Sequence, residues 1–313
     1  MHINSYAKIN LSLDAGDVME NGMHPVDMIM QQTTLCDDVI VDVQESDSFS
    51  ILIKTNNTSI PTDSANIAFR AAERMIEKYQ EIKSEEAEAT KEKMICIFIE
   101  KHIPVAAGLA GGSGNAAAVI HALNAIWELD LSLSELCDIG KTLGSDVPFC
   151  IMGQAKENKR LPRKVRDDKL AVSCARARGT GTELTPVTPL RAYIIIVKPD
   201  IEVSTAEVYR GIDSCNITVR PNNDILEEKL KCHSMIGAVP EMINVLENYT
   251  LNEYPKVGEL KDLMKEKMTG ARCVLMSGSG PSVFAIFDDE LAAIEDFKEI
   301  KYLGYEVHLC KAK

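Results

Sequence analysis

One stretch constrains the fold of this chain more than any other: a turn dense in glycine that runs directly into an alanine-rich helix, from Pro104 to Val119. Glycine lets the backbone adopt positive φ and come close to a ligand. The first turn of the following helix offers unpaired N–H groups and the positive end of its dipole. This combination predicts an anion cradle for the phosphates of a nucleotide.

The loop has neither of the two commonest phosphate-binding spacings. The chain contains no Gly-x-x-x-x-Gly-Lys-Ser/Thr sequence, and no strand followed by Gly-x-Gly-x-x-Gly with a later acidic residue. A third kind of phosphate loop is therefore required. The alternative is purely structural: Gly108, Gly111, Gly112 and Gly114 form only a flexible turn before a buried helix.

Composition and charge argue against several classes of function. The net charge of −13 disfavours nonspecific binding to nucleic acid or to an anionic membrane, because such surfaces carry a basic excess. No apolar run reaches transmembrane length, and residues 1–10 lack the apolar core of a signal peptide, so we expect a cytoplasmic protein. The nine cysteines form no Cys-x-x-Cys pair and the histidines no His-Glu-x-x-His motif, so neither pattern indicates a disulfide framework or a zinc site.

Hydrophobic periodicity predicts an α+β chain with helices and strands in each half. We expect strands over 1–13, 39–43, 49–53, 94–99, 192–197, 273–275, 283–287 and 307–310. Helices are expected over 66–79, 115–128, 204–210, 224–231, 235–246 and 290–299, and from a capping box at Ser132 and Glu135 to Gly144.

Two charged segments interrupt this pattern. Residues 81–93 are nearly all charged or small and predict a solvated helix end plus a turn. Residues 154–168 are rich in lysine and arginine and predict a solvated surface loop, with a basic flap that reaches an anionic substrate as the alternative. We therefore expect an N-terminal domain at 1–153, a basic inserted loop at 154–173 and a C-terminal domain at 174–313.

Three further motifs accompany the glycine loop. Lys8 and Asn10 lie two residues apart in a predicted strand, so both point to one face. Asp146 lies in a predicted helix-to-strand turn, before a segment that a proline stiffens. Residues 275–282, Leu-Met-Ser-Gly-Ser-Gly-Pro-Ser, form a second glycine-rich turn. Each alone has a structural explanation: a solvent-facing lysine, a backbone cap or a hairpin.

In their order along the chain, these motifs resemble those of the GHMP kinases, a superfamily of small-molecule kinases. Within it they are most similar to the 4-diphosphocytidyl-2-C-methyl-D-erythritol kinase family. The resemblance covers nearly the whole chain except 81–93 and 154 to about 173. It is carried by the motifs that begin at Ala7, Gly22, Thr62, Lys101, Gly144, Lys198 and Ser277.

The resemblance implies a two-domain GHMP kinase fold. The N-terminal, ATP-binding domain would resemble ribosomal protein S5 domain 2, the C-terminal domain would be ferredoxin-like, and the active site would lie in the cleft between them. The implied cofactors are ATP and Mg²⁺. The implied substrate is diphosphocytidyl-methylerythritol, phosphorylated on its 2-hydroxyl in non-mevalonate isoprenoid precursor biosynthesis. Neither nucleic acid nor a membrane is an expected partner, and the chain would be a monomer or a homodimer.

Roles carry over to the matching positions. Asp146 would be the general base and a substrate contact, and Lys8 would keep Asp146 ionised and stabilise charge on the γ-phosphoryl group. Asn10 and His24 would bind the substrate, and the Ser113 hydroxyl would lie near Mg²⁺. The implied ATP-binding residues are Asn66, Lys101, Pro104, Ala107, Gly108, Leu109, Gly111, Gly112, Ser113 and Gly114.

Two positions depart from the family's pattern. Met23 stands where a tyrosine would stack on cytosine, and Tyr209 and Phe149 are the candidates to replace that ring. Gly114 stands where a second serine is common. The missing hydroxyl would weaken phosphate or metal binding by the worth of one hydrogen bond, about 0.5–1.5 kcal/mol. Two other functions stay open: a GHMP kinase for another small alcohol, such as homoserine or a mevalonate-like acid, and a non-catalytic ligand sensor on the same fold. Retention of Lys8 and Asp146 speaks against the sensor.

Overall fold

The computed structural model describes residues 1–20, 22–83 and 93–313, which form two compact units. The first unit comprises residues 1–7, 36–105 and 110–173, and the second comprises 8–35, 106–109 and 174–313. Two long strands, β1 (His2–Ala15) and β2 (Val26–Glu45), contribute residues to both units. This division by compactness differs from the continuous domains 1–153 and 174–313, whose boundaries stay a prediction.

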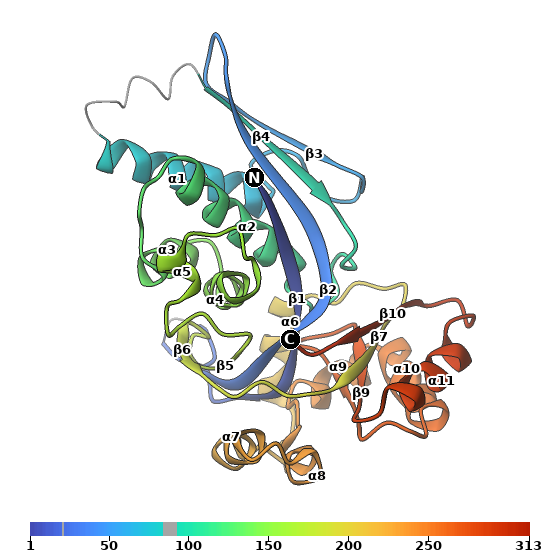
Figure 1. Ribbon diagram of the computed structural model, residues 1–313. Helices are drawn as coiled ribbons and strands as arrows, with labels where there is room; N and C mark the ends of the chain where they lie inside the picture. The colour runs from blue at the N-terminus through green and yellow to red at the C-terminus, as the bar shows by residue number, and fades with distance from the viewer. Residues whose placement is uncertain (21, 84–92) are drawn as a thin grey trace. The chain divides into compact units, whose positions relative to one another are not determined.

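The first unit combines a sheet with a group of packed helices (Figure 1). Strand β4 (Lys93–Glu100) pairs in parallel with β3 (Ser50–Thr55) and antiparallel with the later part of β2. Helix α1 (Ile67–Ile82) buries residues at helical spacing and packs against α2 (Gly111–Ile126). Residues 114–124 of α2 are all buried, because α4 (Val147–Glu157) packs on it as well. Helices α3 (Leu133–Lys141) and α5 (Arg163–Arg166) contact α4.

The second unit contains a four-stranded antiparallel sheet in the order β10-β7-β9-β8. Its strands are β7 (Tyr193–Lys198), β8 (Cys273–Met276), β9 (Val283–Phe287) and β10 (Glu306–Lys311). Helix α10 (Pro255–Lys267) contacts β8 and β9, and α11 (Glu290–Ile300) contacts β7, β9 and β10. This β-α-β-β-α-β order confirms the ferredoxin-like arrangement. The early part of β2 pairs with β5 (Cys174–Gly179), which pairs with β6 (Glu183–Pro186).

Short helices link β7 to α10 in the second unit: α6 (Thr205–Gly211), α7 (Asn223–Lys231), α8 (Met235–Ala238) and α9 (Glu247–Glu253). The single helix predicted over 235–246 is wrong. Helix α8 ends at Ala238, and a 3₁₀ turn that contains Pro240 follows at Val239–Glu241. A proline cannot donate the backbone bond that would continue the helix, so residues 242–246 leave it.

Other predictions have mixed outcomes. The capping box of Ser132 and Glu135 is confirmed, although α3 ends at Lys141, three residues before Gly144. The prediction of a loop over 154–173 is wrong in part, because α4 extends to Glu157 and α5 lies within the segment. Of the charged segment 81–93, residues 84–92 lie outside the described residues. Within the described part of the chain, none of the helices has the length and apolar character needed to cross a membrane.

Candidate functional site

The N-terminus of α2 in the first unit has the features of an anion cradle. Ala110 precedes the helix in the left-handed conformation, and within the described residues no side chain caps the helix. Its first turn contains Gly111, Gly112, Ser113 and Gly114 and carries no acidic residue. The free N–H groups and the positive end of the helix dipole therefore favour an anion there.

Two of these glycines lie in close packing. A Cβ at Gly111 would lie 3.0 Å from Lys101 Nζ and 3.2 Å from Ile103, and one at Gly114 would lie 2.5 Å from Ser5 Oγ. Gly114 therefore cannot be exchanged for the serine that the family pattern favours unless Ser5 moves. The Ser5 hydroxyl occupies the space next to this turn and accepts a hydrogen bond from Asn115 Nδ2 at 3.3 Å.

A buried polar network fixes the chain around this helix end. Asp37 is fully buried and forms an ion pair with Lys101, whose side chain is 4% exposed. Asp37 also accepts hydrogen bonds from the backbone N–H groups of His102 and Ile103, both at 2.8 Å, and from Asn115 Nδ2 at 2.8 Å. In this structure Lys101 is thus a positioning residue, and its contact with ATP stays a prediction.

The two other site residues of the first unit lie at helix starts. Asn66 caps α1: its side chain accepts a hydrogen bond from Ala68 N and donates one to Pro61 O. Asp146 is the N-cap residue of α4, and its half-buried side chain makes no capping bond. The predicted helix-to-strand turn is therefore wrong, because a helix with Pro148 in its first turn follows Asp146. The carboxylate lies at the positive end of that helix.

In the second unit Lys8 is buried, contrary to the reading of a solvent-facing lysine. Lys8 is 4% exposed, and its Nζ donates a hydrogen bond to Asn10 Oδ1 at 2.7 Å. Asn10 is fully buried, and its Nδ2 lies 3.1 Å from Met28 Sδ. Strand β1 therefore presents an ammonium and an amide together on one face, as their spacing predicted.

The second glycine-rich turn packs directly on Gly108. A Cβ on Gly108, whose φ is +71°, would lie 2.5 Å from the carbonyl oxygen of Ser277 and 2.8 Å from that of Gly280. The Ser277 hydroxyl donates to Gly108 O at 3.0 Å. A Cβ on Gly278 would lie 3.7 Å from Lys8 Nζ. The second unit thus brings together Lys8, Gly108 and the 277–280 turn, although they are far apart in the sequence.

Further bonds hold that turn and the flanking backbone. Thr205 Oγ1 lies 2.8 Å from Ser279 Oγ, and Asn244 Nδ2 donates to the carbonyl oxygens of Met276 and Gly278. The predicted nucleotide-binding residues Pro104, Ala107 and Leu109 are buried, so they offer backbone rather than exposed side chains. Sequence reasoning missed Ser5, Asp37 and Asn244. The alternation of the buried valines Val39 and Val41 could have revealed Asp37, because it places residue 37 on the inward face.

His24 lies beside an aromatic ring in the second unit. Its Nδ1 is 2.8 Å from Gly16 O, and its ring centroid is 5.7 Å from that of Tyr209. Met23 is 44% exposed, whereas Phe149 in the first unit is fully buried. Of the two aromatic residues considered for position 23, Tyr209 lies beside His24 within the same unit.

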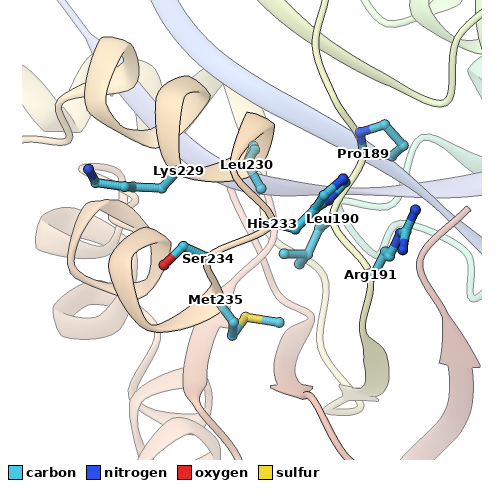
Figure 2. A pocket seen from close by; sticks show the side chains of 8 residues that line it. All are labelled: Pro189, Leu190, Arg191, Lys229, Leu230, His233, Ser234 and Met235. Carbon is cyan, nitrogen blue, oxygen red and sulfur yellow. The ribbon is translucent and has the colours of Figure 1, made fainter.

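The predicted site residues thus fall into two sets. The second unit holds Lys8, Asn10, His24, Ala107, Gly108 and Leu109, and the first holds Asn66, Lys101, Pro104, Gly111, Gly112, Ser113, Gly114 and Asp146. A meeting of Lys8 with Asp146 stays a prediction. None of these residues lines the small pocket in Figure 2, whose volume of about 30 Å³ is far below the roughly 300–1,000 Å³ of typical ligand pockets. Its lining residues are Pro189, Leu190, Arg191, Lys229, Leu230, His233, Ser234 and Met235.

Comparisons with known proteins point to one family. The family model for the GHMP kinases N terminal domain matches residues 66–154, and that for the GHMP kinases C terminal matches 226–305. A 4-diphosphocytidyl-2-C-methyl-D-erythritol kinase of Clostridioides difficile is 41% identical over 96% of this chain and 91% of its own length. A relative with the same name in Alkaliphilus oremlandii is 41% identical over 92% of this chain and 88% of its own.

Solved structures are similar over the whole length. The crystal structure of a 4-(cytidine 5'-diphospho)-2C-methyl-D-erythritol kinase matches with a TM-score of 0.76 and 26% identity, over 100% of this chain and 99% of that one. A homoserine kinase from Cytophaga hutchinsonii matches with a TM-score of 0.65 over 100% and 94%, but at 16% identity it shares the fold alone. The chain therefore belongs to the GHMP kinases, and within them to the 4-diphosphocytidyl-2-C-methyl-D-erythritol kinase family.

Proposed function

We propose that this kinase transfers the γ-phosphoryl group of ATP to the 2-hydroxyl of 4-diphosphocytidyl-2-C-methyl-D-erythritol, a step of non-mevalonate isoprenoid precursor biosynthesis. The observation that carries the proposal is the 41% identity, over 96% of the chain, to a protein with that name. The homoserine and mevalonate alternatives rest on structural neighbours at 14–18% identity, which share only the fold.

The N-terminus of α2 would hold the ATP phosphates. Its uncapped first turn, without an acidic residue, suits the negative charge of a triphosphate. Ser113 would supply the hydroxyl nearest Mg²⁺, whose charge would offset that of the phosphates. Lys101 would act through Asp37 by holding the backbone that leads into the loop.

Asp146 and Lys8 would divide the chemistry. The Asp146 carboxylate would accept the proton of the 2-hydroxyl as the oxygen of that hydroxyl bonds to the γ-phosphorus and the bond to the ADP oxygen breaks. The buried ammonium of Lys8 would stabilise the charge on the transferring group, and Asn10 holds it in place through the 2.7 Å bond.

His24 and Tyr209 would recognise the cytosine. The carbonyl oxygen of Gly16 accepts a hydrogen bond from His24 Nδ1 and so fixes the ring, and His24 would contact the cytosine through Nε2, which lies 3.6 Å from Asp213 Oδ2. The adjacent Tyr209 ring would supply the stacking surface that Met23 lacks.

A panel of alcohols tests the proposal. ADP release is measured with ATP and Mg²⁺ and with the diphosphocytidyl compound, homoserine or mevalonate as acceptor, and the phosphorylated product is located by NMR. We expect turnover with the diphosphocytidyl compound alone. Turnover of homoserine or mevalonate instead would make the chain a kinase for another alcohol, and tight binding without turnover of any acceptor would make it a ligand sensor.

Mg²⁺, a cytoplasmic location and a monomeric or homodimeric state are part of this proposal. Omitting Mg²⁺ in the presence of EDTA should abolish turnover, and light scattering should give the mass of one or two chains. The exposed basic side chains of residues 154–168 should be dispensable for turnover; they are Lys156, Lys159, Arg160, Arg163 and Lys164.

A further inference from the structure

Several metal-ligating side chains, none of them assigned to the kinase reaction, lie close together on the first unit. They are His2 of β1, Asp38 of β2, Glu100 at the end of β4, and His102 just after it, and we call them the histidine–carboxylate cluster. The ligand atoms of Asp38, Glu100 and His102 all lie within 4.8 Å of one another. His2 Nε2 lies 2.6 Å from Asp38 Oδ1.

The strands hold these four side chains in register. Asp38 and Glu100 are direct partners in the antiparallel pairing of β2 with β4, so their side chains share one face. The backbone N–H of His102 is bonded to the buried carboxylate of Asp37, which fixes the start of the next segment. The backbone N–H of Val41 bonds to Met1 O, which holds the beginning of β1 beside β2.

The charges of the cluster favour a cation. Two carboxylates directly opposite each other repel and destabilise a strand pair. His102 Nε2 lies 3.4 Å from Asp38 Oδ2 and 3.9 Å from Glu100 Oε1, so one point between the strands is close to two carboxylates and an imidazole. Ligands about 2.0–2.2 Å from a tetrahedral ion lie roughly 3.3–3.6 Å apart, a range that includes the 3.4 Å between His102 Nε2 and Asp38 Oδ2.

We propose that the histidine–carboxylate cluster binds one divalent transition-metal ion of the zinc class and so ties β1, β2 and β4 together. Two imidazoles with two carboxylates suit Zn²⁺, Co²⁺ or Ni²⁺, whereas Mg²⁺ prefers oxygen ligands. Binding replaces the bond between His2 and Asp38: the Nε2 proton moves to Nδ1, and Nε2 and the carboxylate oxygen each bind the ion. The four side chains are 32–48% exposed, so the ion can enter from solution.

Cobalt provides the probe, because four-coordinate Co²⁺ absorbs visible light strongly. Untagged protein is freed of metal with EDTA, dialysed and titrated with Co²⁺, and the bound ion is then displaced with Zn²⁺. We expect one site per chain with micromolar affinity or better, and the urea midpoint reported by Trp127, which lies in the same unit, should rise with Zn²⁺. One ion per two chains, or octahedral absorption alone, would overturn the proposal.

Variants separate this site from adventitious binding. His102→Gln and the double variant His2→Gln/His102→Gln should weaken Co²⁺ binding at least tenfold and remove the Zn²⁺ effect on the urea midpoint. His308→Gln is the matched control, because His308 is also next to a carboxylate, Glu306 at 3.3 Å, but lies in the second unit. Equal binding by the cluster variants and the control would refute the site, and kinase activity with Mg²⁺ verifies that each variant is folded.

Discussion

The buried ion pair between Lys101 and Asp37 leads to the strongest prediction about stability. Asp37 is fully buried and the Lys101 side chain is 4% exposed, so Lys101→Met would leave a carboxylate inside the first unit without its cation. The remaining donors to Asp37 are the backbone groups of His102 and Ile103 and the amide of Asn115. Removing one partner of such a pair typically costs about 3–5 kcal/mol, because the other charge stays buried.

An exposed ion pair in the same unit supplies the control. Lys141 Nζ lies 2.8 Å from Asp138 Oδ1, but these side chains are 45% and 64% exposed, so Lys141→Met should cost only about 0.2–1 kcal/mol. The chain has a single tryptophan, Trp127, which follows α2 in the first unit, and its fluorescence reports the unfolding of that unit in urea. With a slope of about 2 kcal/mol per molar, Lys101→Met should lower the midpoint by roughly 1.5–2.5 M.

The double variant distinguishes the two roles considered for Lys101. If the pair is structural, Asp37→Asn combined with Lys101→Met should cost less than the sum of the single changes, because no unpaired charge is left. If Lys101 instead contacts ATP, Lys101→Met should raise the KM for ATP while stability changes no more than in Lys141→Met. A loss of stability equal to that of the control would refute the reasoning from burial.

Catalysis, acid stability and the packing of the second unit each have a direct test. Asp146→Asn should lower kcat by at least about 100-fold with little change in the KM for ATP, and a normal kcat would remove Asp146 from the reaction. Lys8→Met should also lower kcat. If the two residues act as a unit, the double variant should lose less kcat than the product of the two single losses, and a loss equal to that product would contradict this. Burial lowers the pKa of His121 from 6.5 to about 4 in the folded protein. The free energy of unfolding should therefore be unaffected by this group above pH 6.5 and fall as the pH drops toward 4, with a loss of about 2 kcal/mol at pH 5. His121→Gln should flatten that profile of urea unfolding, and an equally steep profile would assign the acid sensitivity to other groups. Gly108→Ala should destabilise the second unit by about 1–3 kcal/mol, since its Cβ would meet a backbone carbonyl in a left-handed conformation, and an unchanged melting temperature would refute this packing.

Local patterns predicted much of the secondary structure. The helix over 66–79 and the strand over 94–99 match α1 and β4 closely, because their apolar spacing reflects burial on one side. Helix α4 was missed since its residues Val147 to Ala155 are buried on all sides and show no helical periodicity. The predicted helix over 235–246 failed at Pro240, where local apolar spacing continues but the backbone cannot.

Contacts between distant residues were harder to predict. The motif of Lys8 and Asn10 and the turn at 277–280 were each identified from the sequence, but their meeting with Gly108 depends on how the second unit packs. Asp37 pairs with a lysine 64 positions later, and no local pattern names that partner. The sequence therefore predicted which residue types form the site better than it predicted the hydrogen bonds and ion pairs that position them.

Gly114 shows why a departure from a family pattern has to be judged in three dimensions. From the sequence it is a lost hydroxyl, and thus a weaker phosphate loop. In the structure a side chain at 114 would collide with Ser5 Oγ, which itself accepts a bond from Asn115 at the same turn of α2. The first unit therefore has a hydroxyl beside this turn, contributed by β1 instead of α2. Gln154 of α4 donates to Gly114 O at 2.7 Å, so residue 114 lies where α2, α4 and β1 pack together, and the glycine there fits this packing.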